Sequence, residues 1–347
     1  MGICFAVPEP LETVSGGYAY TRQILARTPL SALLLPQGFP DPGVEALAET
    51  RRRLAVARGP LLIDGLAYGA FPAALADAVG PRAVVMLHHP LDLEGDVDAV
   101  AAAARAKTER RALVPARGVI TSSAATARDL VARFGVEADR LAVVEPGVDP
   151  APRSPVSGEP PLLISVGAMI PRKGHDLLVR ALALLPETAR YRLEIIGPLD
   201  RDAEHLARVR GLIAAAGLGD RVALTGPLSD DALAARMAAA DIAVLPSRHE
   251  GYGMAATEAV ARGVPVVAGR GGALADTASS GIVVDPEDTP AFAAALERLV
   301  TDPAARQRAA DRAWAAAERL PRWEDAAAGV MAALERFLGC AVSSDDD

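Results

Sequence analysis

The strongest constraint on the fold is an alternation of short apolar runs with longer helical stretches, which occurs twice along the 347 residues. In the first half the runs predicted as strands are 2–7, 31–35, 60–63, 83–87, 118–121 and 141–144. The stretches between them that are predicted as helices are 17–26, 43–58, 70–79, 95–115 and 124–134. Strands that alternate with helices of about ten or more residues are typical of parallel βαβ units.

The alternation stops at residues 150–161 (PAPRSPVSGEPP), whose Pro, Ser and Gly content is typical of an interdomain linker. It then restarts with predicted strands at 162–166, 191–196, 222–225, 242–245, 264–268 and 281–284. The helices predicted for this half are 175–185, 203–216, 229–239, 253–262, 290–300, 303–320 and 323–337.

This organisation predicts an α/β protein with two Rossmann-like, doubly wound domains that face a cleft. Residues 1–150 form the first predicted domain and residues 151–320 the second. Residues 321–338 are predicted as a final helix, and residues 339–347 as a polar, acidic tail whose composition is typical of disorder.

Charge, cysteine content and hydropathy exclude several classes of protein. The net charge of −8 argues against nucleic acid as the main partner. The two cysteines, Cys4 and Cys340, are too few for a disulfide framework or a thiolate zinc site. No run approaches the roughly 20 apolar residues that span a bilayer, and the start MGICFAVPEP lacks the basic region of a secretory signal. We therefore expect a cytoplasmic protein.

Two charged segments of the first domain each have a functional and an ordinary interpretation. The first is a basic cluster on one predicted helix, made of Arg105, Lys107, Arg110 and Arg111. This cluster could contact anionic lipid at a membrane surface or a phosphorylated acceptor. The alternative interpretation is an ordinary solvated helix face. The second, Asp96 and Asp98, matches a short DxD metal-binding pattern. Because it opens a helix, where the dipole alone favours acids, we predict no metal site there.

Ligands of doubly wound sheets bind beyond the carboxyl ends of the strands, so the loops that follow the strands are the candidate sites. Gly16 and Gly17 precede a predicted helix, where backbone amides can approach an anion closely, although an ordinary tight turn has the same pattern. His88 and His89 follow the strand 83–87. Because neighbouring side chains on a strand point to opposite faces, only one imidazole is expected to reach a ligand. Packing in the core is the alternative.

The loop GAMIPRKGH, residues 167–175, places two cations just before a helix. Arg172 and Lys173 add to the positive end of the helix dipole, which is unfavourable unless an anion binds there. Among the 36 basic residues, only Lys107 and Lys173 are lysines, and Lys173 lies in this loop. We interpret the loop as a clamp for a diphosphate, with a solvated turn as the alternative.

The segment PSRHEGYGMAATE, residues 246–258, places two carboxylates near one strand-to-helix junction. Glu250 lies in the glycine-bearing loop, and Glu258 lies in the following helix. Carboxylates accept hydrogen bonds from the vicinal hydroxyls of a sugar, and Gly251 and Gly253 let a bulky ligand approach. Helix capping and a solvated glutamate would explain either acid alone, but they explain the combination less well.

The segments GAMIPRKGHDLL and SRHEGYGMAATEAVARGVPVVA resemble the retaining GT-B glycosyltransferases of family 4, also called glycosyl transferases group 1. Glu250 and Glu258 match the E-x7-E motif of that family. Shorter likenesses are EPGVD at 145–149, TGPLS at 225–229 and GGAL at 271–274. The resemblance covers nearly the whole chain and is most specific in residues 160–290. One departure is Ala275-Asp276, where family members often carry Pro-Glu.

The resemblance implies roles for the residues of the second domain. Arg172 and Lys173 would hold the donor diphosphate. Glu258 would bind the ribose hydroxyls, and Glu250 would face the transferred sugar. The other residues that the resemblance assigns to the donor site are Gly167, Gly251, Tyr252, Gly253 and Met254.

In the first domain the resemblance places the Gly16-Gly17 loop against the phosphates. His88 would be the histidine near the sugar, unless the strand ends one residue later and His89 takes that place. With His88, the implied catalytic residues are Arg172, Lys173 and Glu250. The final helix would cross back onto the first domain.

The reaction implied is transfer of a sugar, with retention, from a nucleoside-diphosphate donor to a hydroxyl of a glycan, a lipid or a small molecule. The donor is a co-substrate, so no cofactor is expected, and two cations on the diphosphate make a metal unnecessary. The alternatives are a GT-B sugar-nucleotide epimerase or hydrolase, and a non-catalytic nucleotide-sugar-binding protein. An NAD-dependent oxidoreductase is disfavoured, because no predicted strand is followed by G-x-G-x-x-G.

Overall fold

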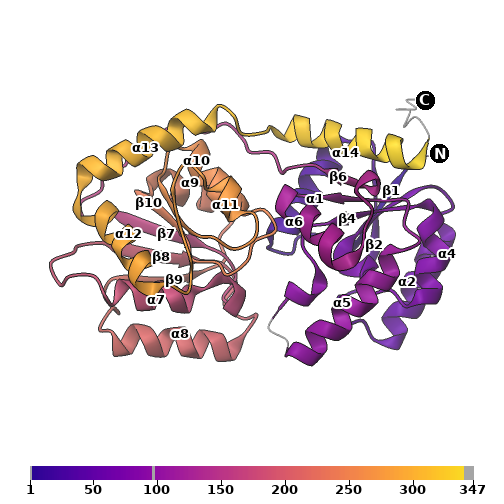
Figure 1. Cartoon of the computed structure of the whole chain (residues 1–347), viewed down its shortest axis with the longest axis horizontal. Coiled ribbons are helices and arrows are strands. Elements are labelled where there is room, and N and C mark those ends of the chain that lie inside the picture. The colour runs from indigo at the N-terminus through magenta and orange to yellow at the C-terminus, as the bar shows by residue number, and fades with distance from the viewer. Residues whose placement is uncertain (1, 96–97, 340–347) are drawn as a thin grey trace. The chain divides into compact units, whose positions relative to one another are not determined.

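The computed structural model describes residues 2–95 and 98–339, and the chain divides into two compact units (Figure 1). The first unit combines residues 1–147 with residues 321–347, and the second unit is the continuous segment 148–320. Each unit contains its own six-stranded sheet. The α/β fold class predicted from the alternating pattern is therefore confirmed. Cys340, Asp96 and nearly all of the predicted tail 339–347 lie outside the described residues.

The strands of the first unit have the order β2-β1-β3-β4-β5-β6, and each neighbouring pair is parallel. Their bounds are β1 Cys4–Pro8, β2 Ser31–Leu35, β3 Leu61–Asp64, β4 Ala83–Leu87, β5 Gly118–Thr121 and β6 Leu141–Val143. The α-helices are α1 Gly16–Arg27, α2 Val44–Val56, α3 Gly65–Tyr68, α4 Ala73–Val79, α5 Ala99–Leu113, α6 Ala124–Asp129 and α14 Trp323–Leu338. Single helical turns lie at Gly80–Arg82, Leu91–Leu93, Leu130–Phe134 and Ala138–Arg140.

Both faces of this sheet are buried, because successive strand residues point to opposite sides and helices cover each side. One side packs against α2, α4 and α5 through a continuous apolar cluster that includes Ile63, Val85 and Val119. On the other side α14 lies against α1, β4 and β5. A Cβ added to Gly118 in β5 would lie 2.4 Å from the Phe337 ring of α14, so only glycine permits this approach.

The second unit has the strand order β12-β11-β10-β7-β8-β9, again with parallel neighbours. The strands are β7 Leu162–Val166, β8 Arg192–Ile196, β9 Val222–Gly226, β10 Ile242–Leu245, β11 Val266–Gly269 and β12 Ile282–Val284. The helices are α7 His175–Leu182, α8 Ala203–Ala215, α9 Asp230–Ala239, α10 Met254–Ala261, α11 Leu274–Thr277, α12 Thr289–Thr301 and α13 Pro303–Ala317, with a 3₁₀ turn at Pro171–Lys173. Two apolar clusters occupy its faces, one including Leu193 and Val244, the other Ile164 and Leu245.

The Pro-rich segment predicted as a linker is ordered against the second unit. The Ser154 hydroxyl donates to the carbonyl of Ala240 at 3.0 Å. The Asp241 carboxylate accepts hydrogen bonds from the N–H groups of Gly158 at 2.8 Å and Leu162 at 2.7 Å. Both Ser154 and Asp241 are buried, so this segment is anchored by satisfied polar groups along the approach to β7.

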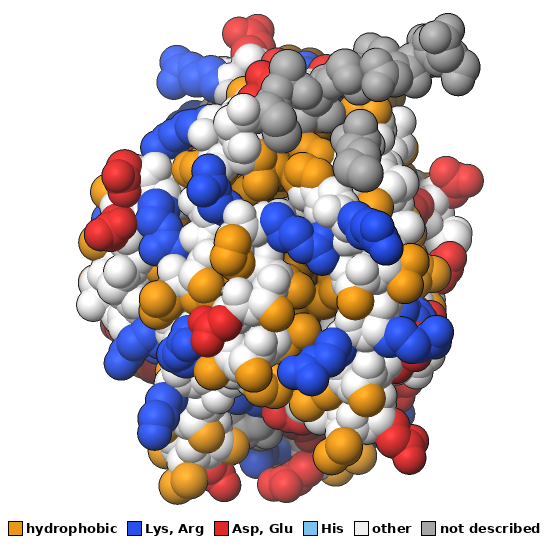
Figure 2. Space-filling view, turned by 90° about the vertical axis from the view of Figure 1, so that its right-hand side faces the viewer, with side chains coloured by type: hydrophobic (Ala, Val, Ile, Leu, Met, Phe, Trp, Pro, Cys, Tyr) orange, Lys and Arg blue, Asp and Glu red, His pale blue; other side chains and the backbone are white. Residues whose placement is uncertain are grey.

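The basic cluster of α5 is largely engaged within the first unit. Arg111 pairs with Asp77 at 2.6 Å, Arg105 pairs with Asp41 at 2.5 Å, and Arg110 donates to a backbone carbonyl. Figure 2 shows Lys and Arg side chains spread among apolar and acidic ones over one end of this unit. Within the two described ranges, no helix has both the length and the apolar content needed to cross a membrane.

Candidate functional site

The candidate site of the second unit lies where two loops follow neighbouring parallel strands. Residues 167–174, the clamp loop, follow β7, and residues 246–253, the glutamate loop, follow β10. The N–H of Arg248 donates to the carbonyl of Arg172 at 2.9 Å and ties the loops together. Gly174 has φ +68°, and a Cβ there would lie 2.0 Å from the Pro246 carbonyl oxygen. Glycine is therefore required at position 174 both for the turn and for the close approach.

Glu250 lies between the two cations of the clamp loop. Its Oε1 is 2.6 Å from Lys173 Nζ and accepts a hydrogen bond from Ser247 at 2.7 Å, and its Oε2 is 3.7 Å from Arg172 Nη1. Burial would raise the pKa of Glu250, but the charges of Lys173 and Arg172 and these hydrogen bonds hold it at about 2. The structure thus brings together three residues that the sequence singles out, with the carboxylate directed at the cations.

A third loop and Gly167 of the clamp loop complete the surroundings of Glu250. Its backbone pairs with a third loop, because its N–H donates to Gly271 at 3.3 Å and its carbonyl accepts from Ala273 at 2.9 Å. Gly167 lies against the stem of Lys173, where an added Cβ would be 3.0 Å from Lys173 Cδ. Small residues at these points let three backbone segments meet around one carboxylate and two cations.

The start of α10 contains the remaining predicted donor residues. Gly251 and Gly253 are buried, and Gly253 precedes the helix with φ +92° and no side-chain cap. Tyr252 is buried, and its carbonyl accepts a hydrogen bond from Thr277 at 2.9 Å. Met254 is the first helical residue and is half-buried. The first-turn N–H groups of α10 therefore lack a side-chain partner of the usual capping kind.

Glu258 differs from Glu250 in its hydrogen-bond partners and in the direction in which its pKa is shifted. It is half-buried in α10, and no residue in the described ranges donates a hydrogen bond to its carboxylate. Burial raises the pKa of Glu258 to about 7, with Asp230 and Asp149 adding to the effect and Arg262 opposing it. A half-buried carboxyl group with a raised pKa is typical of a functional position.

We expect Glu258→Gln to stabilise the protein at about pH 8 by roughly 1–3 kcal/mol. The pKa of Glu258 is raised from 4.5 to about 7 in the folded protein, so the wild-type carboxyl favours folding only while it is protonated. This contribution to the free energy of unfolding is fully present below the pKa of the unfolded state. It is lost as the pH rises through the pKa of the folded state. Urea unfolding from about pH 4.5 to 8 measures this, since the two proteins should converge at the acid end. A pH-independent difference would contradict the assignment.

In the first unit, the structure places Gly17 and His88 side by side. Gly16 begins α1, which Ser15 caps by accepting a hydrogen bond from the N–H of Tyr18 at 3.3 Å. A Cβ added to Gly17 would lie 3.0 Å from His88 Cδ2. Burial lowers the pKa of His88 to about 4, with a smaller contribution from His89. His88 is therefore neutral at pH 7, and its Nε2 has no partner within the described residues.

The neighbouring histidine has a different environment. His89 Nε2 lies 2.5 Å from Glu94 Oε2, so this ring is engaged with a carboxylate on its own loop. Of the two residues that sequence reasoning leaves open, His88 is thus the one beside the glycine loop. Its ring also meets the Tyr20 ring edge-on, with centroids 5.3 Å apart.

Asp98, the one acid of the DxD segment that the structure describes, lies at the start of α5. Asp98 caps α5 by accepting hydrogen bonds from the N–H groups of Val100 at 2.9 Å and Ala101 at 2.8 Å. This explains an acid at that position without a metal. Nowhere in residues 2–95 and 98–339 do three His, Cys, Asp or Glu side chains form a group suited to an ion.

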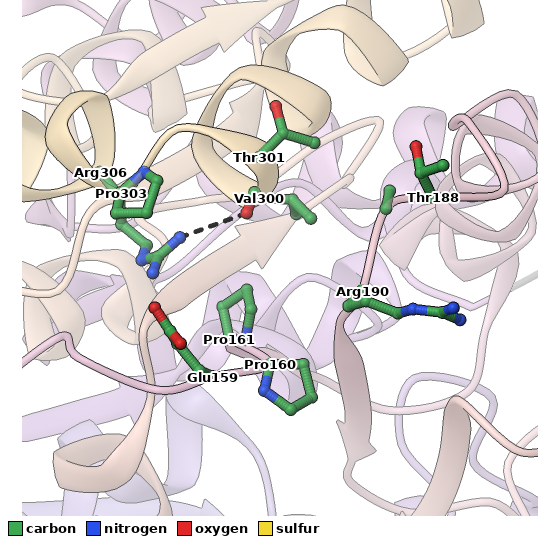
Figure 3. A pocket seen from close by; sticks show the side chains of 10 residues that line it. Glu159, Pro160, Pro161, Thr188, Arg190, Val300, Thr301, Pro303 and Arg306 are labelled. Atoms are coloured by element: carbon green, nitrogen blue, oxygen red, sulfur yellow. Dashed lines mark hydrogen bonds between the residues drawn. The ribbon is translucent and has the colours of Figure 1, made fainter.

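Figure 3 shows a separate hollow of about 500 Å³ in the second unit, at the other edge of the sheet. Residues 159–161 and 188–190 line it and precede β7 and β8, so it lies at the amino ends of these strands. Arg306, which also lines it, is buried and donates to the carbonyls of Leu299 at 2.8 Å and Val300 at 3.3 Å. Its charge therefore stabilises the carboxyl end of α12.

The two parallel six-stranded sheets give this chain the fold of solved GT-B proteins. A sucrose-phosphate synthase of Thermosynechococcus elongatus has the same fold, with a TM-score of 0.79, 22% identity and coverage of 97% of this chain and 99% of that one. The Anabaena protein HepE, solved in complex with UDP and glucose, gives a TM-score of 0.78 at 18% identity, covering 96% of this chain and 100% of HepE.

The sequence comparisons define the family. Residues 151–315 match the model of glycosyl transferases group 1, and residues 21–152 match that of glycosyltransferase family 4. The MMP alpha-(1->4)-mannosyltransferase of Mycolicibacterium hassiacum is 30% identical over 320 residues, covering 87% of this chain and 76% of the relative. The chain therefore belongs to the family of group 1 glycosyltransferases.

For other relatives, the matched region covers a smaller share of the relative's length. The D-inositol 3-phosphate glycosyltransferase of Xylanimonas cellulosilytica is 33% identical over 243 residues, which cover 64% of this chain and 58% of that protein. The chain thus spans a little more than half of that relative's length.

Proposed function

We propose that the chain transfers a sugar, with retention, from a nucleoside-diphosphate donor to a hydroxyl-bearing acceptor. The main support for this function is a pair of cations at the β7–α7 junction, Arg172 and Lys173, which lie beside the buried Glu250. Such a group of charges, at the carboxyl edge of a doubly wound sheet, suits a diphosphate attached to a sugar. The UDP bound by HepE makes a nucleoside diphosphate the first ligand to test.

In the proposed reaction the bond between the anomeric carbon and the diphosphate oxygen breaks, and its electron pair leaves with the diphosphate. The acceptor oxygen forms the new bond on the same face, and its proton passes to the departing phosphate oxygen. Lys173 and Arg172 stabilise the charge that develops on the leaving group, because they are held in place before the reaction begins. No side chain is assigned as nucleophile. Glu250 stabilises the positive charge that develops on the sugar.

The remaining donor residues have binding roles in this proposal. Glu258 accepts hydrogen bonds from the ribose hydroxyls, which its unpartnered carboxylate is free to do. Gly167, Gly251, Tyr252, Gly253 and Met254 shape the donor site, where uncapped N–H groups of α10 also favour an anion. In the first unit, Gly16, Gly17 and the neutral His88 are the residues proposed to contribute to donor binding.

The test is acceptor-dependent turnover with a donor selected by binding. A panel of nucleoside-diphosphate sugars is screened for thermal stabilisation, since a ligand at about a hundred times its Kd adds roughly 2.7 kcal/mol to stability. Release of nucleoside diphosphate is then followed with and without candidate acceptors. Sugar transfer that requires an acceptor supports the proposal. Hydrolysis or epimerisation without one supports the alternative enzyme, and binding without turnover supports a non-catalytic protein.

Donor binding is expected to need no divalent metal, because two side-chain cations already neutralise the diphosphate. Calorimetric titration of UDP with and without EDTA measures this directly. The Kd should be the same in both conditions, and added Mg²⁺ or Mn²⁺ should not increase the affinity. A large loss of affinity on chelation would contradict the proposal.

A further inference from the structure

We infer that Arg248 is a positioning residue for the diphosphate site, acting through the clamp loop and held in place by Asp176. The inference rests on the proposed function, because it assigns Arg248 the task of fixing Arg172, Lys173 and Glu250 in the geometry that binds the diphosphate.

The Arg248 guanidinium contacts three separate segments of the second unit. Its Nη1 donates to the carbonyl of Pro171 at 2.6 Å, directly before Arg172. Nη1 and Nη2 donate to the two carboxylate oxygens of Asp176 at 3.0 and 3.1 Å, in a bidentate pair. Its Nε donates to Glu287 at 2.6 Å. Together with its backbone bond to Arg172, this side chain fixes the clamp loop on both sides of the cations.

The position of Arg248 in the chain makes these contacts relevant to the site. Arg248 lies two residues before Glu250, and Asp176 lies three residues after Lys173 in the first turn of α7. A shift of this side chain would therefore move the clamp loop relative to the glutamate loop. Displacement of charged groups by about 1 Å is enough to lower a rate by about a hundredfold.

The charge arrangement argues against a purely stabilising role. Arg248 is 32% exposed, and an ion pair of this partly buried kind seldom contributes much net stability. The side chain of Asp176 is only 9% exposed. Burial would raise its pKa, but the hydrogen bonds and charge of Arg248 hold it below its usual value. The opposite charges of Arg248 and Asp176 offset each other, so the main contribution of the pair is to fix the orientation of Arg248. A planar guanidinium does this through two parallel hydrogen bonds, which a lysine cannot make.

The test combines single and double variants, with donor kinetics and UDP calorimetry as the functional measurements and thermal unfolding as the stability measurement. Arg248→Met is expected to lower kcat/KM by about tenfold or more and to weaken UDP binding. Arg248→Lys keeps the charge and the fold but loses the bidentate geometry, so it should show the loss in kcat/KM without a lower unfolding midpoint. Arg208→Met is the control, since Arg208 pairs with exposed Glu204 at 3.2 Å on the surface helix α8 and should be silent.

The double variant Lys173→Ala/Arg248→Met separates positioning from a structural role. If Arg248 acts through the clamp, removing it from a protein that already lacks Lys173 should cost much less than in the wild type. The inference would be overturned if the losses in kcat/KM of the two single variants multiplied in the double variant. It would also be overturned if Arg248→Lys had the kcat/KM of the wild type. A silent Arg248→Met beside a damaging Lys173→Ala would overturn this inference alone. A silent Lys173→Ala would overturn the diphosphate site and the inference together.

Discussion

Replacing Lys173 by alanine is expected to remove about 2–4 kcal/mol of transition-state stabilisation, the scale of losing one electrostatic donor to a developing charge. This corresponds to a fall in kcat/KM of roughly 30- to 1000-fold. The reason is that Lys173 lies at the end of the clamp loop, where the leaving diphosphate is proposed to bind. Initial rates at varied donor and fixed acceptor concentration measure the loss.

The effect of this change on the fold can be separated from its effect on the reaction. Lys173 Nζ is 2.6 Å from Glu250, so Lys173→Ala leaves a buried carboxylate with Arg172 as its remaining cation, 3.7 Å away. The double variant Lys173→Ala/Glu250→Gln removes that charge, and it should recover stability without recovering turnover. Lys107→Ala, at an exposed position of α5, is the matched control and should keep both stability and turnover. Equal losses from the two lysines would show that the clamp is elsewhere.

Glu250→Gln is expected to lower kcat by about a hundredfold or more while leaving the affinity for free nucleoside diphosphate intact or slightly raised. The proposed sugar gains positive charge as its bond breaks, so the carboxylate matters most at the transition state. The same carboxylate competes for Lys173, and its neutral replacement leaves that cation available to the diphosphate. Steady-state kinetics and UDP calorimetry on the same preparation measure both effects.

Glu258→Gln provides the contrast to this variant. The ribose is unchanged during transfer, so its contact with Glu258 should be equal in the ground and transition states. Removing it should raise KM for the donor and weaken UDP binding, with a smaller change in kcat. If both glutamine variants lost nucleotide affinity equally and kept kcat, the division of roles between the two glutamates would be wrong.

The strands and the loops that follow them were predictable because their signals are local. Apolar runs of four to six residues, bounded by Gly or Pro, mark β7 and β10, and a doubly wound sheet brings their carboxyl ends to one edge. The pairing of Lys173 with Glu250 was not predictable in the same way. These residues are 77 positions apart, and their contact depends on the strand register and on the close approach at Gly174.

Two other features show where sequence reasoning stops. Arg248 is one of many arginines, since all but two of the 36 basic residues are arginine, and nothing local distinguishes it. Asp176 offers only a weak signal, an acid directly inside the helix that follows two cations. His88 and His89 are equivalent in sequence, and they differ only once the folded chain places Gly17 beside one and Glu94 beside the other.

The placement of α14 has a consequence for how the chain is made. The first unit is assembled from both ends of the chain, whereas the second is one continuous segment. Synthesis proceeds from the amino terminus, so β1 to β6 emerge long before the helix that packs on β4 and β5. The part of the sheet around Gly118, against which Phe337 lies in the folded chain, has no α14 to pack on it until all of the second unit has been translated. The second unit is therefore synthesised completely before the last helix of the unit that precedes it.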